Sequence, residues 1–180
     1  MSRNDKRIGE SETHYFSTHF YSMLCKQGPE GVQRWTAKKG IDIFQKRLIF
    51  VPVNKSLHWS LTVIVNPGAI RSHHEMMDRG MGQAGKDPFD ERGELEKPCP
   101  MLLFFDSLEC HSKATVSRRL REWLNAEWNR RSEGEQDDLK DPFDTKSMKI
   151  FNPKCKYGAF HLIGWPLSNF FYFCLQHLGN

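Results

Sequence analysis

The amino-acid sequence predicts that all 180 residues form a single α+β domain, in which a small mixed sheet is flanked by helices. The strand-like runs lie at 48–53, 58–65 and 101–105, and the stretches with helical spacing of apolar residues lie at 11–24 and 112–131. With 38% hydrophobic residues, a chain of this length can bury one sizeable core.

The composition is that of an ordinary soluble globular protein, with 27% charged residues. The net charge of +4 is spread along the chain and gives little reason to expect a nucleic-acid partner. Five cysteines at irregular spacing, together with a polar N-terminus in which no secretory signal is readable, favour reduced thiols in the cytosol or nucleus.

The first helix is predicted over 11–24, with Ser11 or Thr13 as its N-cap. Its apolar residues at helical spacing are Phe16, Phe20, Met23 and Leu24. The sequence Gly-Pro-Glu-Gly at 28–31 then breaks the chain, and a short helical piece around Val32 and Trp35 follows, ending near Gly40.

The central strands are predicted to form an antiparallel hairpin. The run at 48–53 is joined to a second β-rich run at 58–65 by a short polar turn. Pro52 has no N–H group to donate, so it argues for an edge strand or a strand end. A third apolar strand at 101–105 ends at Asp106.

Residues 67–100 are rich in glycine, proline and charged residues and have almost no apolar periodicity, which predicts an insertion or a long surface loop. The clearest helix follows at 112–131. Its apolar face comprises Val116, Leu120, Trp123, Leu124 and Trp128. An acidic loop at 132–144 then leads into a short strand at 148–151.

The pentapeptide Lys-Asp-Pro-Phe-Asp occurs twice, at 86–90 and 140–144. Asp-Pro starts turns readily, so two similar loop turns are the expectation. An Asp-Pro-Phe motif that docks on an adaptor protein is the alternative.

Residues 152–180 form an atypical tail, whose segment 157–180 is rich in aromatic residues and contains no Lys, Arg, Asp or Glu. A membrane-spanning helix needs about 20 mostly apolar residues. Polar residues and Pro166 interrupt the segment. A buried or aberrant tail is therefore expected, with membrane insertion as the alternative.

Two residues at strand ends are candidates for catalysis. His58 opens a predicted strand, which would fix its ring while the adjoining turn leaves it exposed, as a general base requires. Asp106 lies where the third strand ends. If the two strands are neighbours, the carboxylate of Asp106 can accept a hydrogen bond from the imidazole and fix its tautomer. Taken singly, each residue has a structural alternative: a satisfied core histidine, and an aspartate in a turn or helix cap.

Two sequence blocks resemble a known family. Val-Pro-Val-Asn-Lys-Ser-Leu-His-Trp-Ser-Leu at 51–61 and Leu-Leu-Phe-Phe-Asp-Ser-Leu at 102–108 are similar to the SUMO-specific proteases, the sentrin-specific or Ulp group of cysteine peptidases. The segments Tyr-Phe-Ser-Thr-His-Phe-Tyr at 15–21 and Ile-Asp-Ile-Phe at 41–44 resemble the same family. The resemblance covers about 14–125.

The resemblance implies a papain-like cysteine protease core that needs no cofactor or metal and cleaves after the Gly-Gly tail of SUMO or another ubiquitin-like protein. It implies that His58 is the catalytic base, that Asp106 is its orienting acid, and that Trp59 covers the narrow tunnel for the tail. An indole lid leaves room for glycine and excludes larger side chains. The long segment between His58 and Asp106 resembles the branch with a large insertion, which acts on SUMO chains. The nucleus is the expected location, with the cytoplasm as the alternative.

The family places its nucleophile in Gln-x-Asn-x-x-Asp-Cys-Gly, and no cysteine of this chain fits that pattern. The cysteines downstream of Asp106 are Cys110, Cys155 and Cys174, and the first of them follows too early. A core that is incomplete at its C-terminus is therefore expected. The alternative to a working peptidase is an inactive or truncated family member that at most binds a ubiquitin-like protein. The histidines and cysteines, Cys110-His111 included, lack the paired spacing of a zinc site.

Overall fold

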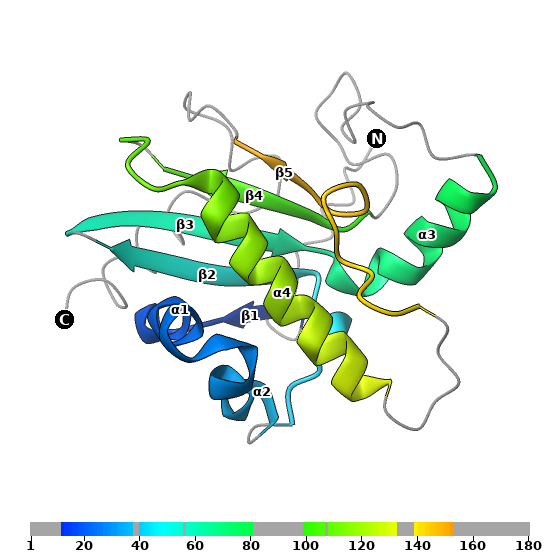
Figure 1. Ribbon diagram of the computed structural model, residues 1–180, viewed down its shortest axis with the longest axis horizontal. Coiled ribbons are helices and arrows are strands. Elements are labelled where there is room, and N and C mark those ends of the chain that lie inside the picture. The colour runs from blue at the N-terminus through cyan, green and yellow to red at the C-terminus, as the bar shows by residue number, and fades with distance from the viewer. Residues whose placement is uncertain are drawn as a thin grey trace, which may run out of the picture.

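The computed structural model of the chain describes residues 12–37, 40–55, 57–80, 99–106, 108–132 and 139–152. It is an α+β fold built on a five-stranded sheet (Figure 1). The strands are β1 (Thr13–Tyr15), β2 (Leu48–Lys55), β3 (His58–Val65), β4 (Met101–Phe105) and β5 (Lys149–Phe151). The helices are α1 (Thr18–Val32), α2 (Arg34–Ala37), α3 (Ile70–Asp78) and α4 (Lys113–Arg131), with 3₁₀ turns η2 (Ile43–Gln45) and η3 (Pro67–Ala69).

The sheet is mixed, with the strand order β1-β2-β3-β4-β5. β2, β3 and β4 pair antiparallel, whereas β1 joins β2 and β5 joins β4 in parallel. Parallel neighbours need a crossover connection, and the segments that contain α1 and α4 provide the two crossovers. The predicted hairpin and the predicted mixed sheet with flanking helices are confirmed.

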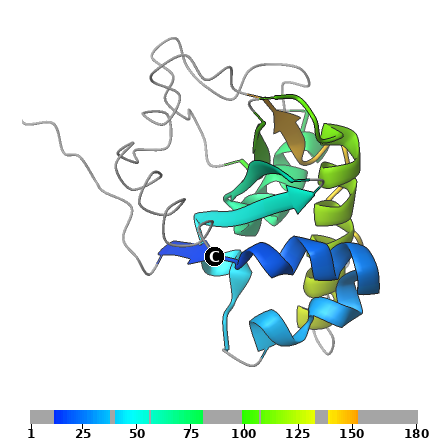
Figure 2. The same cartoon turned by 90° about the vertical axis from the view of Figure 1, so that its left-hand side faces the viewer.

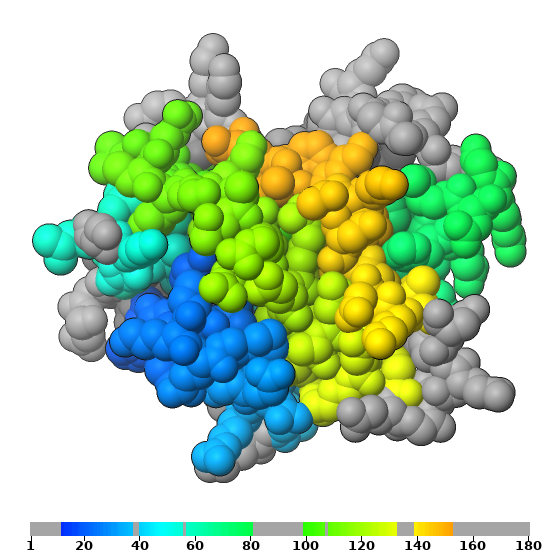
Figure 3. Space-filling model, in the orientation of Figure 1, coloured from blue at the N-terminus to red at the C-terminus, as the bar shows by residue number. Residues whose placement is uncertain are grey.

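Helices α1 and α4 cover one face of the sheet, and the two views of the cartoon agree on this arrangement (Figure 2). The space-filling view shows α1 and α4 lying against each other over that face (Figure 3). An aromatic cluster joins them, because the ring of Phe20 lies 3.7 Å from that of Phe16 and 5.0 Å from that of Trp123. All three side chains are almost fully buried. The helical side of the sheet therefore holds the main core.

The central strands are buried on both faces. Ile49, Val51 and Val53 of β2 belong to the core under the helices. Alternate residues of the central strands form a second buried apolar cluster, because successive side chains in a strand point to opposite faces. This second cluster comprises Leu48, Phe50, Leu61, Val63, Val65, Met101, Leu103 and Phe105. β1 pairs with β2 and ends before it reaches Pro52, so the position of this proline at a local edge agrees with the prediction.

The first helix begins later than predicted. β1 occupies the first residues of the predicted helix 11–24, and α1 starts only at Thr18, with Ser17 in the N-cap position. The helical spacing gave too early a start for this helix, because Phe16, which precedes the helix, stacks on Phe20 inside it. Both rings enter the same core although they belong to different backbone conformations.

The predicted break at 28–31 is a kink rather than an end. Gly28 adopts a φ of 72° inside α1, a conformation that glycine reaches without steric cost. Pro29 follows where a new helical segment starts, and its missing N–H group is not needed there. α1 therefore continues to Val32, which was predicted to belong to the next helical piece, and α2 (Arg34–Ala37) is the part of that piece around Trp35.

The predicted loop at 67–100 starts with helical structure, so its N-terminal boundary was wrong. η3 and α3 occupy its first residues, and Ile70 is fully buried in the main core. Gly68 lies so close to the carbonyl oxygen of Phe44 that an added Cβ would come within 2.0 Å of it. Gly68, which in the sequence seemed to indicate a loop, is thus required by a close backbone contact. Residues 81–98 lie outside the described residues.

The second Lys-Asp-Pro-Phe-Asp copy is a turn packed on α4. Phe143 is buried, and its backbone exchanges two hydrogen bonds with the side-chain amide of Asn125, of 2.8 and 3.1 Å. A buried phenylalanine is not accessible to an adaptor, so this copy fits the turn interpretation. The first copy and the tail from residue 153 onward lie outside the described residues. In the part of the chain that the structure describes, no helix is long and apolar enough to cross a membrane.

Candidate active site

The β2–β3 hairpin brings His58 beside the loop that follows β4. His58 is the first residue of β3 and pairs with Lys55 at the end of β2. β4 lies antiparallel to β3, with Phe105 opposite Leu61, so the chain leaves the sheet at Asp106 close to the start of β3. The two strands are neighbours, so the condition for a contact between His58 and Asp106 is met.

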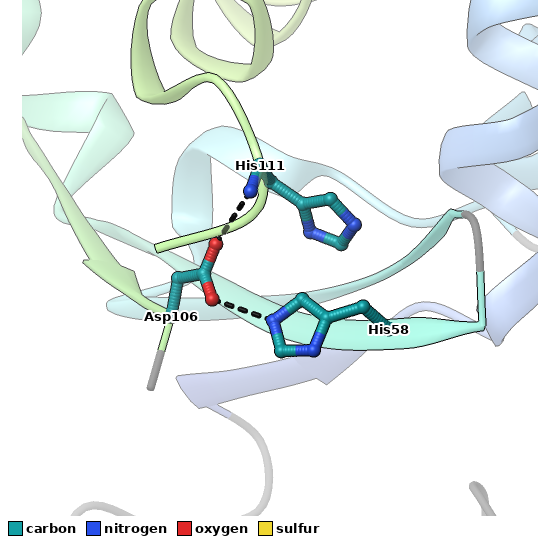
Figure 4. Close-up of side chains that lie close together, drawn as sticks. All are labelled: His58, Asp106 and His111. Atoms are coloured by element: carbon teal, nitrogen blue, oxygen red, sulfur yellow. Dashed lines mark hydrogen bonds and ion pairs between the residues drawn. The ribbon is translucent and has the colours of Figure 1, made fainter. Parts of the chain in front are cut away.

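His58 and Asp106 form a short hydrogen bond (Figure 4). Nε2 of His58 lies 2.6 Å from Oδ1 of Asp106. The side chain of Asp106 is 1% exposed and that of His58 is 14% exposed. The bond is therefore shielded from water while part of the imidazole remains accessible. This is the hydrogen bond that the sequence leads one to expect when the two strands are neighbours.

The carboxylate of Asp106 is held in its charged form. Burial alone raises the pKa of this carboxyl group. The backbone N–H of His111 at 2.8 Å, the imidazole of His58 and the backbone N–H of Leu108 at 3.2 Å outweigh burial and hold the pKa below its usual range. Asp106 is consequently a hydrogen-bond acceptor at neutral pH.

This charged carboxylate fixes the tautomer of His58. A carboxylate can only accept hydrogen bonds, so Nε2 of His58 carries a proton and, in the neutral ring, Nδ1 keeps its lone pair. Figure 4 shows the second ring nitrogen of His58 turned away from Asp106. An imidazole in this state can remove a proton from a nucleophile at Nδ1, after which Asp106 stabilises the imidazolium.

His111 is a further member of the site that the sequence analysis did not predict. Its Nδ1 lies 2.7 Å from Oγ of Ser60, and its Nε2 lies 3.0 Å from the backbone carbonyl oxygen of Lys55. The centroid of its ring is 4.9 Å from that of His58. In the sequence, its membership of the site could have been inferred only from its position in the short loop after Asp106, because a side chain in such a loop can turn back toward the hairpin.

The three side chains also form a set of candidate metal ligands. The donor atoms of His58, Asp106 and His111 lie within 4.8 Å of one another. Both ring nitrogens of His111 already bind protein groups, since a carbonyl takes the proton on Nε2 and the hydroxyl of Ser60 meets the lone pair on Nδ1. A metal ion bound by all three side chains would therefore have to break the hydrogen bonds of His111.

Trp59 is half-buried and follows His58 in β3. Because side chains alternate along a strand, its indole projects from the sheet face opposite the one that carries His58 and Ser60. Leu61 lies on the same face as Trp59 and belongs to the second apolar cluster. Trp59 is therefore adjacent to His58 along the chain, with its side chain on the other face of the strand.

Neither Cys110 nor Cys99 has an arrangement that would activate a nucleophile. The thiol of Cys110 donates to the carbonyl of Leu108 at 3.5 Å, inside its own loop, rather than to His58. Burial raises the pKa of the Cys99 thiol, which disfavours the reactive thiolate. The remaining downstream cysteines, which lie outside the described residues, are Cys155 and Cys174.

An imidazole held by a buried carboxylate at one end of a mixed sheet is the arrangement that the acid–base half of a hydrolase with a nucleophilic side chain requires. The amino-acid sequence matches the Ulp1 protease family, C-terminal catalytic domain, over residues 2–154. The chain belongs to this family. The resemblance recognised in the sequence is therefore confirmed, and the matched region ends just before Cys155.

Individual relatives agree with the family match. The chain is 33% identical over 125 residues to sentrin-specific protease 2 of Homo sapiens, covering 69% of this chain and 18% of that protein. It is 32% identical over 127 residues to ubiquitin-like-specific protease 2 of Schizosaccharomyces pombe, covering 63% of this chain and 19% of that protein. The chain thus spans less than a fifth of the length of these relatives.

A solved structure shares the fold. The crystal structure of a de-sumoylating protease superposes with a TM-score of 0.55 at 20% sequence identity, covering 82% of this chain and 45% of the other. At this identity the match shows the fold alone. The predicted cysteine-protease core of the Ulp type is confirmed at that level.

Proposed function

We propose that this site binds the Gly-Gly tail of SUMO or another ubiquitin-like protein and is built to hydrolyse the bond after it with a cysteine nucleophile. The observation that carries the proposal is the 2.6 Å bond between His58 and Asp106 in a chain of the Ulp1 protease family. His58 is the base, acting through Nδ1, and Asp106 orients it. The names of the relatives, sentrin-specific and ubiquitin-like-specific proteases, support this substrate class.

Trp59 is the residue we assign to the tail. A glycine tail passing beside an indole fills a space that a larger side chain would not enter, so specificity arises from steric exclusion. Trp59 is half-buried, so the residue is still partly accessible to a ligand. Nuclear localisation belongs to the same proposal, and fluorescence microscopy of the tagged protein tests it.

Binding without hydrolysis is the second candidate function. It is favoured by Cys110, the described cysteine downstream of Asp106, because its thiol is bonded within its own loop. A base and an acid without a placed thiolate lose on the order of 10⁴-fold or more of the catalysed rate, since the members of such a triad act as a unit. For the chain as written we therefore expect tail-dependent binding with little or no turnover.

Two measurements separate these functions. The first compares retention of the chain by immobilised SUMO that ends in Gly-Gly with retention by SUMO that lacks the tail. Trp59→Ala should weaken the tail-dependent retention about tenfold, the effect of losing one good contact. The matched control is Trp35→Ala, which removes a half-buried tryptophan from α2. Equal retention with and without the tail would contradict the proposed substrate.

The second measurement uses a SUMO probe whose electrophilic C-terminus alkylates an active-site thiol, followed by mass spectrometry. We expect no adduct for the chain as written. A stoichiometric adduct on one cysteine that disappears in His58→Ala would instead show a working peptidase. Absence of both adduct and tail-dependent binding would refute the proposed function altogether.

A further inference from the structure

His111 connects the loop after β4 to both arms of the hairpin that carries His58. It directly precedes Ser112, the N-cap of α4, whose hydroxyl accepts a hydrogen bond from the backbone N–H of Thr115 at 3.3 Å. The first turn of a 19-residue helix therefore fixes the backbone at His111. A residue anchored in this way can act as a rigid support for its neighbours.

The backbone of His111 fixes one half of the Asp106 carboxylate. Its N–H donates to Oδ2 at 2.8 Å, whereas His58 binds Oδ1. The backbone N–H of Leu108 also donates to Oδ1, at 3.2 Å. Donors on both oxygens prevent the carboxylate from rotating about its Cβ–Cγ bond, so the oxygen that faces His58 stays in place.

The ring of His111 fixes the hairpin. The carbonyl of Lys55, which Nε2 reaches, belongs to the residue paired with His58. The hydroxyl of Ser60, which Nδ1 reaches, lies two residues beyond His58 on the same face of β3. Ser60 is buried, so water does not compete well for this bond. The ring thus binds the chain on both sides of the base.

The partners also restrict the tautomer of this ring. The carbonyl of Lys55 can only accept, so Nε2 of His111 carries a proton and, in the neutral ring, Nδ1 accepts from the hydroxyl of Ser60. A neutral ring of His111, tilted by 57° to that of His58, can lie beside an imidazolium without charge repulsion. The contact is therefore compatible with proton uptake by His58.

We propose that His111 is a positioning residue, which holds the imidazole of His58 in register with the carboxylate of Asp106. The catalytic meaning of this role rests on the proposed function, because it assumes that His58 is the base. His111→Ala tests the ring alone, since the variant keeps the backbone N–H that binds Asp106. His111→Gln is the conservative variant, because its amide offers one donor and one acceptor in place of the two ring nitrogens.

The experiment is ¹⁵N NMR of the histidine rings in the complete chain, without SUMO. In the wild type we expect one tautomer of His58, with the proton on Nε2. In His111→Ala we expect a mixture of tautomers and about tenfold faster exchange of the ring N–H with water, the change that loss of one net hydrogen bond produces. His111→Gln should restore most of the protection. The matched control is His73→Ala in α3, beyond the opposite end of β3.

An unchanged His58 signal in a folded His111→Ala variant would overturn the inference. If that variant does not fold, Ser60→Ala carries the test, because it removes the partner of Nδ1 and keeps the ring. Faster exchange of the His58 ring N–H in Ser60→Ala supports the positioning role of His111, and unchanged exchange refutes that role. Failure of SUMO binding would refute the proposed function but would not change the NMR result for His58. Failure of the proposed function can therefore be distinguished from failure of the positioning role of His111.

Discussion

Asp106, which follows β4, and Asp144, which precedes β5, make the same kind of local hydrogen bonds but differ in their surroundings. Each carboxylate accepts backbone N–H groups from the loop that follows it. The donors to Asp106 are Leu108 and His111, and the donors to Asp144 are Lys146 and Ser147. In each case burial by itself raises the pKa of the carboxyl group, but the hydrogen bonds outweigh burial and lower the pKa.

The two sites differ in burial and in one partner. Asp144 is exposed and also accepts from the hydroxyl of Ser147 in its own turn at 2.9 Å. Asp106 is buried and binds the imidazole of His58, which comes from another strand. An aspartate that binds the backbone of the following loop is thus a structural feature shared by both sites. It becomes a candidate catalytic element where the carboxylate is shielded from water and a histidine reaches it.

The largest expected effect tests whether the Asp144 turn is purely structural. Phe143 is buried, with its ring centroid 6.0 Å from that of Phe44 and 6.1 Å from that of Trp128. Phe143→Ala should lower the free energy of unfolding by about 3–5 kcal/mol, because it leaves a cavity in the core. Urea unfolding measures this change. The control, Leu108→Ala in an exposed position, should change stability by less than about 0.5 kcal/mol.

Phe143→Ala should also leave the ring signals of His58 unchanged under native conditions. A shifted His58 spectrum in the folded variant would show that the two regions are coupled and would break the comparison.

The second prediction contrasts Asp106→Asn with Asp144→Asn. At the buried site an amide replaces a charged acceptor that faces three donors, so the free energy of unfolding should fall by about 1.5–3 kcal/mol. At the exposed site water replaces the lost bonds, and the fall should stay below about 1 kcal/mol. Asp106→Asn should also disturb the tautomer of His58 in ¹⁵N NMR, and Asp144→Asn should not. Equal losses of stability would contradict the assigned difference in burial.

The parts of the fold that the sequence predicted are those with a repeating pattern. β2, β3, β4 and α4 are long enough for the apolar period to show, and their predicted ranges agree closely with the structure. β1 has three residues and exists because it pairs with Leu48–Phe50 far along the chain, which no local pattern reveals. α3 starts after a proline and a glycine that usually indicate loops, and the buried contacts of Ile70 and Gly68 decide its position.

The candidate site likewise contains residues that the sequence predicted and one that it did not. His58 and Asp106 could be predicted because each lies at the end of a recognisable strand and inside a sequence block of the family. His111 could not, because its position depends on the course of the 106–112 loop. Glu109 in this loop has a φ of 51°, a left-handed conformation that a non-glycine residue rarely adopts. Loop conformations of this kind are set by tertiary contacts rather than by spacing.

The third prediction concerns acid pH. The pKa values of Asp106 and Asp144 are lowered in the folded chain, so near pH 4 the unfolded chain binds more protons than the folded one. Their contribution to stability is therefore fully present above the unfolded pKa of about 4, and it is lost as the pH falls through the lower folded values. Urea unfolding at pH 6 and pH 3 measures the loss. Asp106→Asn and Asp144→Asn should each reduce it, and an unchanged pH dependence in both variants would contradict the assignment.

The smallest expected effect concerns the turn beside His58. Leu57 has a φ of 60° and a fully exposed side chain, whereas Asp141, near Asp144, has a φ of 49° and exchanges hydrogen bonds with Asn129. A left-handed leucine costs about 1–2 kcal/mol, and glycine there loses about 0.5–1 kcal/mol in chain entropy. Leu57→Gly should therefore raise the free energy of unfolding by about 0.5 kcal/mol. Asp141→Gly should lower it, because the carboxylate that accepts from the side-chain amide of Asn129 is lost. Urea unfolding of both variants decides the matter: destabilisation by Leu57→Gly would mean that the leucine makes contacts that outweigh its backbone strain.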